Sequence, residues 1–203
     1  MSAIYDSFME SSERACRDAW RGELLSGLEG EVLEIGAGTG INLHYYPRTL
    51  SRLVVSEPDA HMRQKLVAKL ASEAPANAEV SSAGVDALPF ADASFDVVVS
   101  TLVLCSVPDL GDALTEIKRV LKPSGKLVFL EHVAADDRPG RLRWQLRVEP
   151  VWKRIAGNCH LARRTGLAIR QAGFEIEIEV KESMRKSLPI VRASIRGVAR
   201  KPG

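Results

Sequence analysis

The clearest chemical signal in the chain is one acidic residue followed by three glycines, Glu34, Gly36, Gly38 and Gly40. These residues follow a short apolar run typical of a buried strand, where the chain would turn into a helix. Glycines at such a turn allow a sharp bend and a close approach of the backbone to a ligand. The spacing differs from the GxGxxG fingerprint of dinucleotide sites, since residue 41 is Ile. The pattern therefore favours a small-molecule site other than a pyrophosphate site.

A second acidic residue, Glu57, ends the next apolar run, 17 residues after Gly40 (57 − 40 = 17). A carboxylate at the end of the second strand can accept hydrogen bonds from both hydroxyls of a ribose. Nicotinamide-dependent enzymes use an acid in this place too. Glu57 thus indicates an adenosine-containing ligand without choosing between cofactors.

His132 follows a later strand-like run, 126–130, and is expected at the same edge of the sheet. It is a candidate general base, or a residue that orients an acceptor. A merely structural hydrogen bond to a neighbouring loop is the alternative. The three cysteines, Cys16, Cys105 and Cys159, form no CxxC pair, so we expect neither a disulfide framework nor a metal site. Cys105 and Cys159 are interpreted as small buried residues, and the cysteine usage indicates a reducing, cytoplasmic setting.

Alternating strand-like and helix-like segments must position these residues. Short apolar runs at 31–35, 52–56, 95–100 and 126–130, with a weaker one at 78–81, are typical of strands buried on both faces. Helical patterns are expected at about 12–28, at 60–72 after Asp59 as N-cap, and at 110–121. This alternation predicts a doubly wound α/β fold.

The last third of the chain differs in pattern. We expect a helix over 141–155, kinked or restarted at Pro150, and another over 161–172 that ends at Gly173. Trp144 and Trp152 are interpreted either as the wall of an acceptor pocket or, from their helical spacing, as core residues, with a core position favoured for at least one of them. Segments 174–180 and 193–199 suggest strands at an antiparallel edge. Residues 138–170 hold nine cations and one acid. This basic segment is interpreted either as solvated helix faces or as a surface that touches anionic membranes.

The composition is that of one globular domain. The chain has 203 residues, 45% hydrophobic and 27% charged, and a net charge of +2, which gives no sign of a nucleic-acid partner. No apolar run approaches the length of a membrane span, and the start does not read as a signal peptide. We expect a single domain, 1–203, with a helical cap (1–29), a cofactor-binding core (30–135), a helical acceptor-side segment (136–173) and a strand pair (174–203).

The motif E-x-G-x-G-x-G around Gly38 resembles motif I of the class I S-adenosylmethionine-dependent methyltransferases, of the methyltransferase type 11 kind. This resemblance implies a seven-stranded, mostly parallel sheet, S-adenosylmethionine as cofactor and S-adenosylhomocysteine as product. The segment 83–90 resembles the family's adenine-binding segment, with Gly84 where many members have Asp, so the Val85 backbone is the better contact. The cofactor-binding residues implied are Glu34, Gly36, Ala37, Gly38, Gly40, Asn42, Glu57, Pro58, Gly84, Val85 and Thr101.

A narrower resemblance covers most of the chain. The segments 101–107, 131–135, Trp144-Gln145, Pro150-x-Trp152 and Cys159-x-Leu161-x-Arg163 are similar to the alkyl thiol methyltransferases and their bacterial relatives. This implies a small lipophilic acceptor, with a thiol as the first expectation. C-methylation of a quinone precursor, N-methylation of a lipid amine, and a cofactor-binding module without turnover stay open. The oligomeric state is not indicated by any pattern.

Overall fold

The computed structural model describes residues 18–184 and 186–203. Helices and strands alternate along the chain, as the sequence predicts. In order, the elements are α2 (Asp18–Leu25), β1 (Glu31–Ile35), the 3-10 helix η2 (Leu43–Tyr45), β2 (Arg52–Ser56), α3 (Ala60–Glu73), β3 (Ala78–Ser81), β4 (Phe95–Thr101), α4 (Leu110–Val120), β5 (Leu121–His132), α5 (Pro139–Ile155), α6 (Thr165–Gln171), β6 (Glu175–Ser183), the 3-10 helix η3 (Pro189–Val191) and β7 (Ala193–Arg200).

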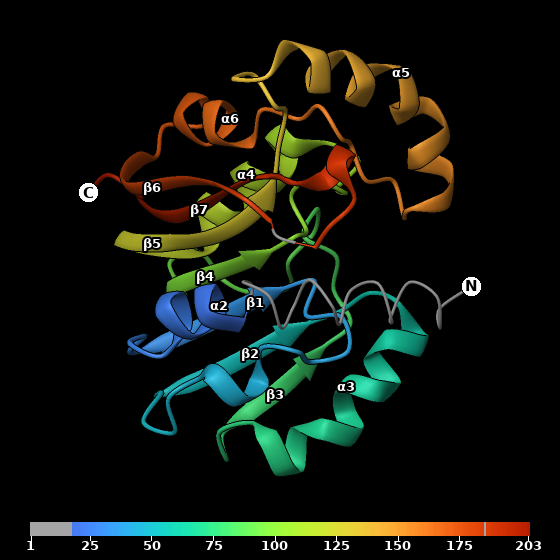
Figure 1. Cartoon of the computed structure of the whole chain (residues 1–203). Helices are drawn as coiled ribbons and strands as arrows, with labels where there is room; N and C mark the ends of the chain where they lie inside the picture. The colour runs from blue at the N-terminus through green and yellow to red at the C-terminus, as the bar shows by residue number, and fades with distance from the viewer. Residues whose placement is uncertain (1–17, 185) are drawn as a thin grey trace.

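Within the described residues, seven strands form one sheet in the order β3-β2-β1-β4-β5-β7-β6 (Figure 1). Strands β1 to β5 pair in parallel, and β7 lies antiparallel between β5 and β6. The predicted doubly wound, mostly parallel sheet with antiparallel pairing at one edge is confirmed. The strand order reverses between β1 and β4, which is where open α/β sheets bind ligands, beyond the carboxyl ends.

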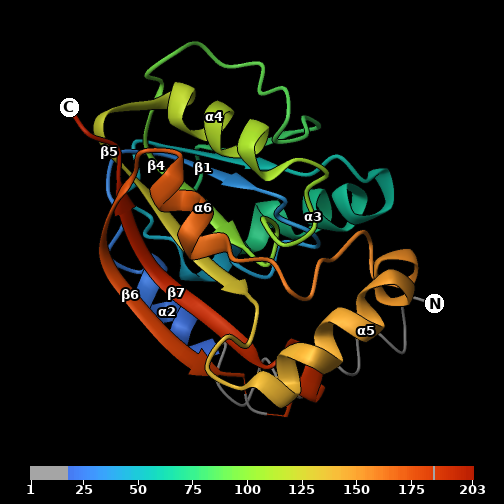
Figure 2. The ribbon, with the colours of Figure 1, turned by 90° about the horizontal axis from the view of Figure 1, so that it is seen from above.

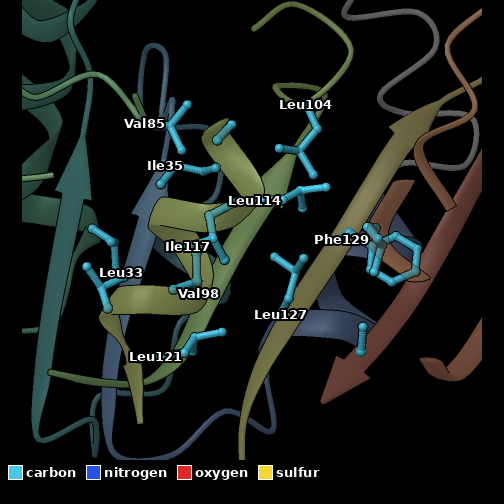
Figure 3. Packing of buried hydrophobic residues seen from close by; sticks show 14 of the residues in the cluster. Leu33, Ile35, Val85, Val98, Leu104, Leu114, Ile117, Leu121, Leu127 and Phe129 are labelled. Carbon is cyan, nitrogen blue, oxygen red and sulfur yellow. The ribbon is translucent and has the colours of Figure 1, made fainter. Parts of the chain in front are cut away.

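Side chains of the central strands alternate between two cores, one on each face of the sheet. Leu33 and Val98 pack with α4 and α6 on one face, and Val32 and Val97 pack with α2 and α3 on the other. Figure 3 shows Leu114 and Ile117 of α4 over Leu33, Val98 and Leu127, and the view from above separates α4 from α2 across the sheet (Figure 2). Nearly continuous apolar strands are required because both faces are covered.

Two predicted helix boundaries differ from the structure by three or four residues. The N-terminal helix ends at Leu25 rather than at residue 28, and its predicted residues before 18 lie outside the described part. The helix expected from residue 161 begins at Thr165, because Arg163 holds a loop by donating to the carbonyls of Leu104 and Val107. Of the two outcomes expected at Pro150, a kink or a restart, the restart is not seen, since α5 continues through this residue. The cap at Asp59 is confirmed, as is the helix end before Gly173, which adopts a φ of +81°.

Helix α5 packs little against the body of the protein and lies beyond the carboxyl ends of β4 and β5 (Figures 1 and 2). Its one buried residue is Gln145, whereas Trp144 is 60% exposed and Ile155 is 67% exposed. The core position expected for at least one of the two tryptophans is not taken by Trp144, whose side chain is exposed; Trp152 is half-buried. No helix among the described residues has the length and apolarity to cross a membrane.

Candidate active site

The glycine loop follows β1 and takes a conformation that favours glycine. Gly36, Gly38 and Gly40 have φ angles of +57°, +59° and +81°. A Cβ on Gly36 would lie 2.6 Å from Val103, and one on Gly40 would lie 2.8 Å from Leu43, so both glycines are needed for packing. A Cβ on Gly38 would meet nothing within 4 Å. Gly38 is therefore the glycine that keeps open space, as a loop that cradles a ligand requires.

Glu57 lies beside this loop, at the end of β2. Its side chain is 6% exposed, and its oxygens accept from the N–H groups of Gly38 (2.8 Å) and Asp59 (2.9 Å). The carboxylate thus joins the glycine loop to the start of α3. Each carboxylate oxygen retains a lone pair for a further donor. Glu57 directly follows β2, as its place after the second apolar run predicts, and Pro58 after it is exposed.

A buried polar network lies where β1 meets β4. Asn42 donates to Glu34 (2.6 Å) and to the hydroxyl of Thr101 (3.0 Å), and it accepts from Arg21. Arg21 also donates to Thr101 (3.1 Å), and Tyr46 donates to Glu34 (2.8 Å). Glu34, Asn42 and Thr101, which the resemblance assigned to the cofactor, are thus brought together. Arg21 was missed, because a single arginine in a helix carries no sequence signal for burial.

Burial dominates the electrostatics of this network. Desolvation raises the pKa of Glu34, although the hydrogen bonds from Tyr46 and Asn42 and the charge of Arg21 oppose it. Desolvation and the nearby Glu34 also raise the pKa of Tyr46 well above its usual range. Glu34 therefore acts as a buried anchor between β1 and η2. It does not offer an exposed carboxylate to a ligand in this arrangement.

The predicted adenine segment lies next to the first core. Val85 is 9% exposed and packs with Ile35 and Leu104 in the cluster drawn in Figure 3, and Gly84 precedes it. The carbonyl of Ala83 accepts from the Ser56 hydroxyl at the end of β2. The Val85 side chain is thus committed to the core, so a contact through its backbone, as expected from sequence, is the one that this geometry allows.

Glu131, near the end of β5, organises the loop after β4. Its fully buried carboxylate accepts from the hydroxyl of Ser100 and from the N–H groups of Val103, Leu104 and Cys105 (2.7–3.2 Å). Burial raises its pKa, against these hydrogen bonds. The sequence analysis gave Glu131 no separate role, because its donors are backbone groups of a loop 26–28 residues away in the chain.

His132 does not face open space. Its ring is 4% exposed, with Nε2 lying 3.1 Å from the carbonyl oxygen of His160 and 3.3 Å from the sulfur of Cys159. Burial lowers the pKa of His132, but contact with Cys159 and the charge of Glu131 outweigh it and leave the pKa raised. The structural hydrogen bond that the sequence analysis kept as an alternative is present. Its role as a base stays a prediction.

These residues fit an adenosine-bearing cofactor without a pyrophosphate. The open space at Gly38, the adjacent buried carboxylate of Glu57 and the Val85 backbone offer a cradle, a ribose acceptor and an adenine contact. No run of backbone N–H groups of the kind that binds a pyrophosphate is needed for such a ligand. The residues that would hold it lie in the segments that follow β1, β2 and β3.

Similarity to known proteins agrees with this geometry. A methyltransferase-domain family model matches residues 33–129. Human thiol S-methyltransferase TMT1B is 39% identical over 187 residues, which cover 90% of this chain and 75% of that protein. The chain belongs to the class I S-adenosylmethionine-dependent methyltransferases. The demethylmenaquinone methyltransferase of Thermobifida fusca is 29% identical over 140 residues, 68% of this chain and 56% of that protein.

The fold is shared more widely within this methyltransferase class. A solved S-adenosylmethionine-dependent methyltransferase from Methanosarcina mazei superimposes with a TM-score of 0.66 at 20% identity, over 85% of this chain and 92% of that one. The protein is therefore an S-adenosylmethionine-dependent methyltransferase, as the motif I resemblance implied.

Proposed function

We propose that this enzyme transfers a methyl group from S-adenosylmethionine to the sulfur of a small lipophilic thiol. The observation that carries the proposal is the 39% identity with human thiol S-methyltransferase TMT1B along 90% of the chain. The similarity covers the cofactor-binding core and also the segments around Cys105, His132 and Cys159. Methylation of a quinone precursor is the second candidate, supported by the weaker similarity to a demethylmenaquinone methyltransferase.

The proposed reaction is an in-line displacement. When bound, the cofactor supplies a methyl group that its positive sulfur has already activated. The acceptor thiol would lose its proton to solvent, its sulfur would form the new bond to the methyl carbon, and the electron pair of the broken carbon–sulfur bond would stay on the departing sulfur. The protein's part is to align the groups and to exclude water. Glu57 and the glycine loop would fix the cofactor, and the thiol, with an ordinary pKa near 8.5, needs only modest help to ionise.

We further propose that α5 brings the enzyme to an anionic lipid surface, where a lipophilic acceptor is concentrated. Trp144, Leu146, Val151 and Ile155 of this helix are all more than half exposed. Six cations flank them within 138–155, and the single acid, Glu149, already pairs with the His160 ring and the Ala162 N–H. Apolar side chains bordered by cations match the interface of anionic membranes. The cytoplasmic leaflet offers such a surface, and a cytoplasmic location is part of this proposal.

A turnover screen tests the acceptor. The purified full chain is incubated with S-adenosylmethionine and, separately, with aliphatic and aromatic thiols, a demethylated quinol and long-chain amines, and both products are measured by mass spectrometry. We expect S-methyl product and S-adenosylhomocysteine in equal amounts with the thiols. Methylation of the quinol with none of the thiols would overturn the thiol assignment. Binding of S-adenosylhomocysteine with no turnover on any acceptor would favour a binding module.

Vesicle sedimentation tests the role of α5. We expect binding to phosphatidylcholine vesicles that contain phosphatidylserine, less binding without it, and a loss as salt is raised. Replacing Trp144 and Ile155 together by Gln should reduce binding. The matched change on another exposed apolar residue, Val67→Gln in α3, should not. Equal binding of both variants to the anionic vesicles would contradict the proposal.

A further inference from the structure

Two cysteines and a histidine from separate parts of the chain meet in the interior. Cys105 lies in the loop after β4, His132 ends β5, and Cys159 lies in the loop after α5. One sulfur or nitrogen atom from each lies within 4.8 Å of the other two. The three residues are 2%, 4% and 9% exposed. Buried thiols and an imidazole at this separation are the donor set of a metal site.

The spacing agrees with tetrahedral coordination. Sulfur and nitrogen ligands at the usual zinc distances lie about 3.6 Å apart, and two sulfurs about 3.8 Å apart. The sulfur of Cys159 is 3.3 Å from Nε2 of His132 and 4.0 Å from Nδ1, values on either side of the sulfur–nitrogen separation. Small side-chain shifts suffice for either ring nitrogen to bind. Ligation through Nδ1 would leave the Nε2–H to donate to the carbonyl of His160, 3.1 Å away.

Surrounding hydrogen bonds hold these ligands in place. The Trp152 indole N–H donates to the sulfur of Cys159 (3.2 Å). The N–H of Cys105 donates to Glu131, and its carbonyl accepts from the N–H of His160 (2.8 Å), which ties the two cysteine loops together. An orienting hydrogen bond on a histidine ring and N–H donors toward sulfur are the usual outer shell of a metal site. These hydrogen bonds therefore hold the three side chains close together independently of a metal.

We propose that Cys105, His132 and Cys159 bind a zinc ion. Two thiolates and a neutral imidazole around a divalent cation carry no net charge, which suits a buried position. Sulfur and nitrogen ligands in tetrahedral arrangement select zinc among the common divalent ions. The three residues leave one of four positions for water or a small ligand. The proposal goes against the expectation from sequence of no metal, and it does not depend on the acceptor being a thiol.

Two other arrangements of the cluster are outcomes of the tests below. In an ion pair between His132 and Cys159, the Cys105 thiol donates to the Cys159 sulfur, so the three groups are satisfied without a metal. A disulfide between Cys105 and Cys159 would leave the indole N–H of Trp152 and the His132 ring facing a neutral sulfur. Zinc uses both sulfurs and the ring together.

Metal content is the first test. Full-length protein without a histidine tag is stripped with a chelator, shown by circular dichroism to be folded, and then titrated with zinc or cobalt. We expect about one zinc per chain, and with cobalt the absorption bands of a tetrahedral thiolate site. Folded, stripped protein that binds neither ion would overturn the proposal. A Cys105–Cys159 disulfide in freshly purified protein would also overturn it, since both sulfurs would be consumed.

Variants assign the ligands independently of activity. Cys105→Ser and Cys159→Ser should each weaken zinc binding by more than about 100-fold, beyond what outer-shell changes cause. Trp152→Phe, which removes only the N–H donor to Cys159, should weaken it about 10- to 100-fold. Trp144→Phe, on the exposed face of the same helix, is the matched control and should leave zinc binding at the wild-type value. Cysteine variants that fold, bind S-adenosylhomocysteine and bind zinc like the wild type would contradict the assignment.

Discussion

At the carboxyl ends of the strands, two groups of residues differ in how they are brought together. We call them the cofactor half, on the β1–β2 side, and the cysteine half, on the β4–β5 side. On the β1–β2 side, the glycine loop and Glu57 lie within 23 residues of Glu34 (57 − 34 = 23), and the consecutive elements β1, η2 and β2 position them. On the β4–β5 side, Cys105, His132 and Cys159 are 27 residues apart in each step (132 − 105 = 27; 159 − 132 = 27). The cofactor half is therefore a local sequence motif, whereas the cysteine half is a cluster that only the tertiary fold brings together.

The two halves are joined at a single buried network. Asn42, from the loop after β1, reaches Thr101 at the end of β4, and Arg21 from α2 donates to both. On the far side of Thr101, the loop 102–107 contacts the glycine loop through Val103 and carries Cys105. The comparison thus predicts that some variants affect one half alone, whereas those at the junction affect both.

The largest effect is expected for Gly38→Val, which should abolish measurable cofactor binding and leave the cysteine half intact. The new side chain would enter space that is open in the protein, so it meets the ligand rather than the fold. Valine at a φ of +59° costs about 1–2 kcal/mol, which a domain of this size tolerates. Calorimetry with S-adenosylhomocysteine and thermal unfolding measure the two effects.

Gly27→Val is the matched control for that variant. A Cβ at Gly27 also meets nothing within 4 Å, but its φ lies outside the left-handed region and it is not part of the glycine loop. It should bind the cofactor like the wild type. If Gly38→Val folds and keeps its affinity, the loop does not hold the ligand.

The next largest effect concerns the junction. Asn42→Ala should lower the free energy of unfolding by about 3 kcal/mol, because buried groups of Glu34, Arg21 and Thr101 each lose a hydrogen-bond partner. Urea unfolding measures the change. Asn77→Ala, which removes donors to the carbonyls of Leu50 and Ser51 at an exposed position, should lower it by only about 1 kcal/mol. Equal losses would mean that the network contributes no more than a surface loop.

The cofactor half was accessible from sequence for a physical reason. Strand β1, the glycines and Glu57 follow one another in the chain, so spacing alone encodes their geometry. The strands could be predicted equally well, because strands that are covered on both faces must be apolar. Asp59 was recognisable as a cap because its bond to the N–H of Met62 is local.

The cysteine half could not be predicted from the sequence in the same way. Nothing in the spacing of Cys105 and Cys159 indicates that β4, β5 and the loop after α5 meet, since no CxxC pair marks them. Arg21 and Glu131 were missed for the same reason: their partners are tertiary. For the tryptophans, helical spacing favoured a core position for at least one, and the placement of α5 leaves Trp144 exposed.

Within the cofactor half, Glu57→Gln should weaken binding by about 10- to 150-fold, or 1.5–3 kcal/mol. The amide would remove the charge and turn a donor toward the N–H of Gly38 or Asp59, both of which now donate to the carboxylate. The loss should be the same for S-adenosylmethionine and S-adenosylhomocysteine, with kcat at saturating cofactor little changed, because the ribose is common to both.

Glu29→Gln, an exposed carboxylate before β1, is the control for that variant and should bind both ligands normally. If Glu57→Gln lowers kcat at saturating cofactor while affinity is kept, the carboxylate acts on the reaction rather than on the ribose.

The smallest effect is expected at the opposite, amino end of the sheet, where neither half of the site lies. Asp96 accepts from the N–H of Glu31 and from Lys122, both within 2.9 Å. Burial raises the pKa of Asp96, but these two donors outweigh it and the pKa lies below its usual value. A depressed carboxyl pKa stabilises the fold above about pH 4, and this contribution is lost as the pH falls through the folded-state pKa. Because the side chain is 41% exposed, solvent screening limits the contribution to about 1 kcal/mol or less.

Asp96→Asn should therefore lower the free energy of unfolding slightly at pH 7, with the gap between variant and wild type closing at pH 3. It should leave cofactor and zinc binding unchanged. Asp92→Asn, whose side chain is 79% exposed in its pair with Arg119, should show no such gap. If Asp96→Asn lost cofactor binding or zinc binding, the amino end of the sheet would be coupled to the site. The cofactor half and the cysteine half would then not act independently of the rest of the sheet.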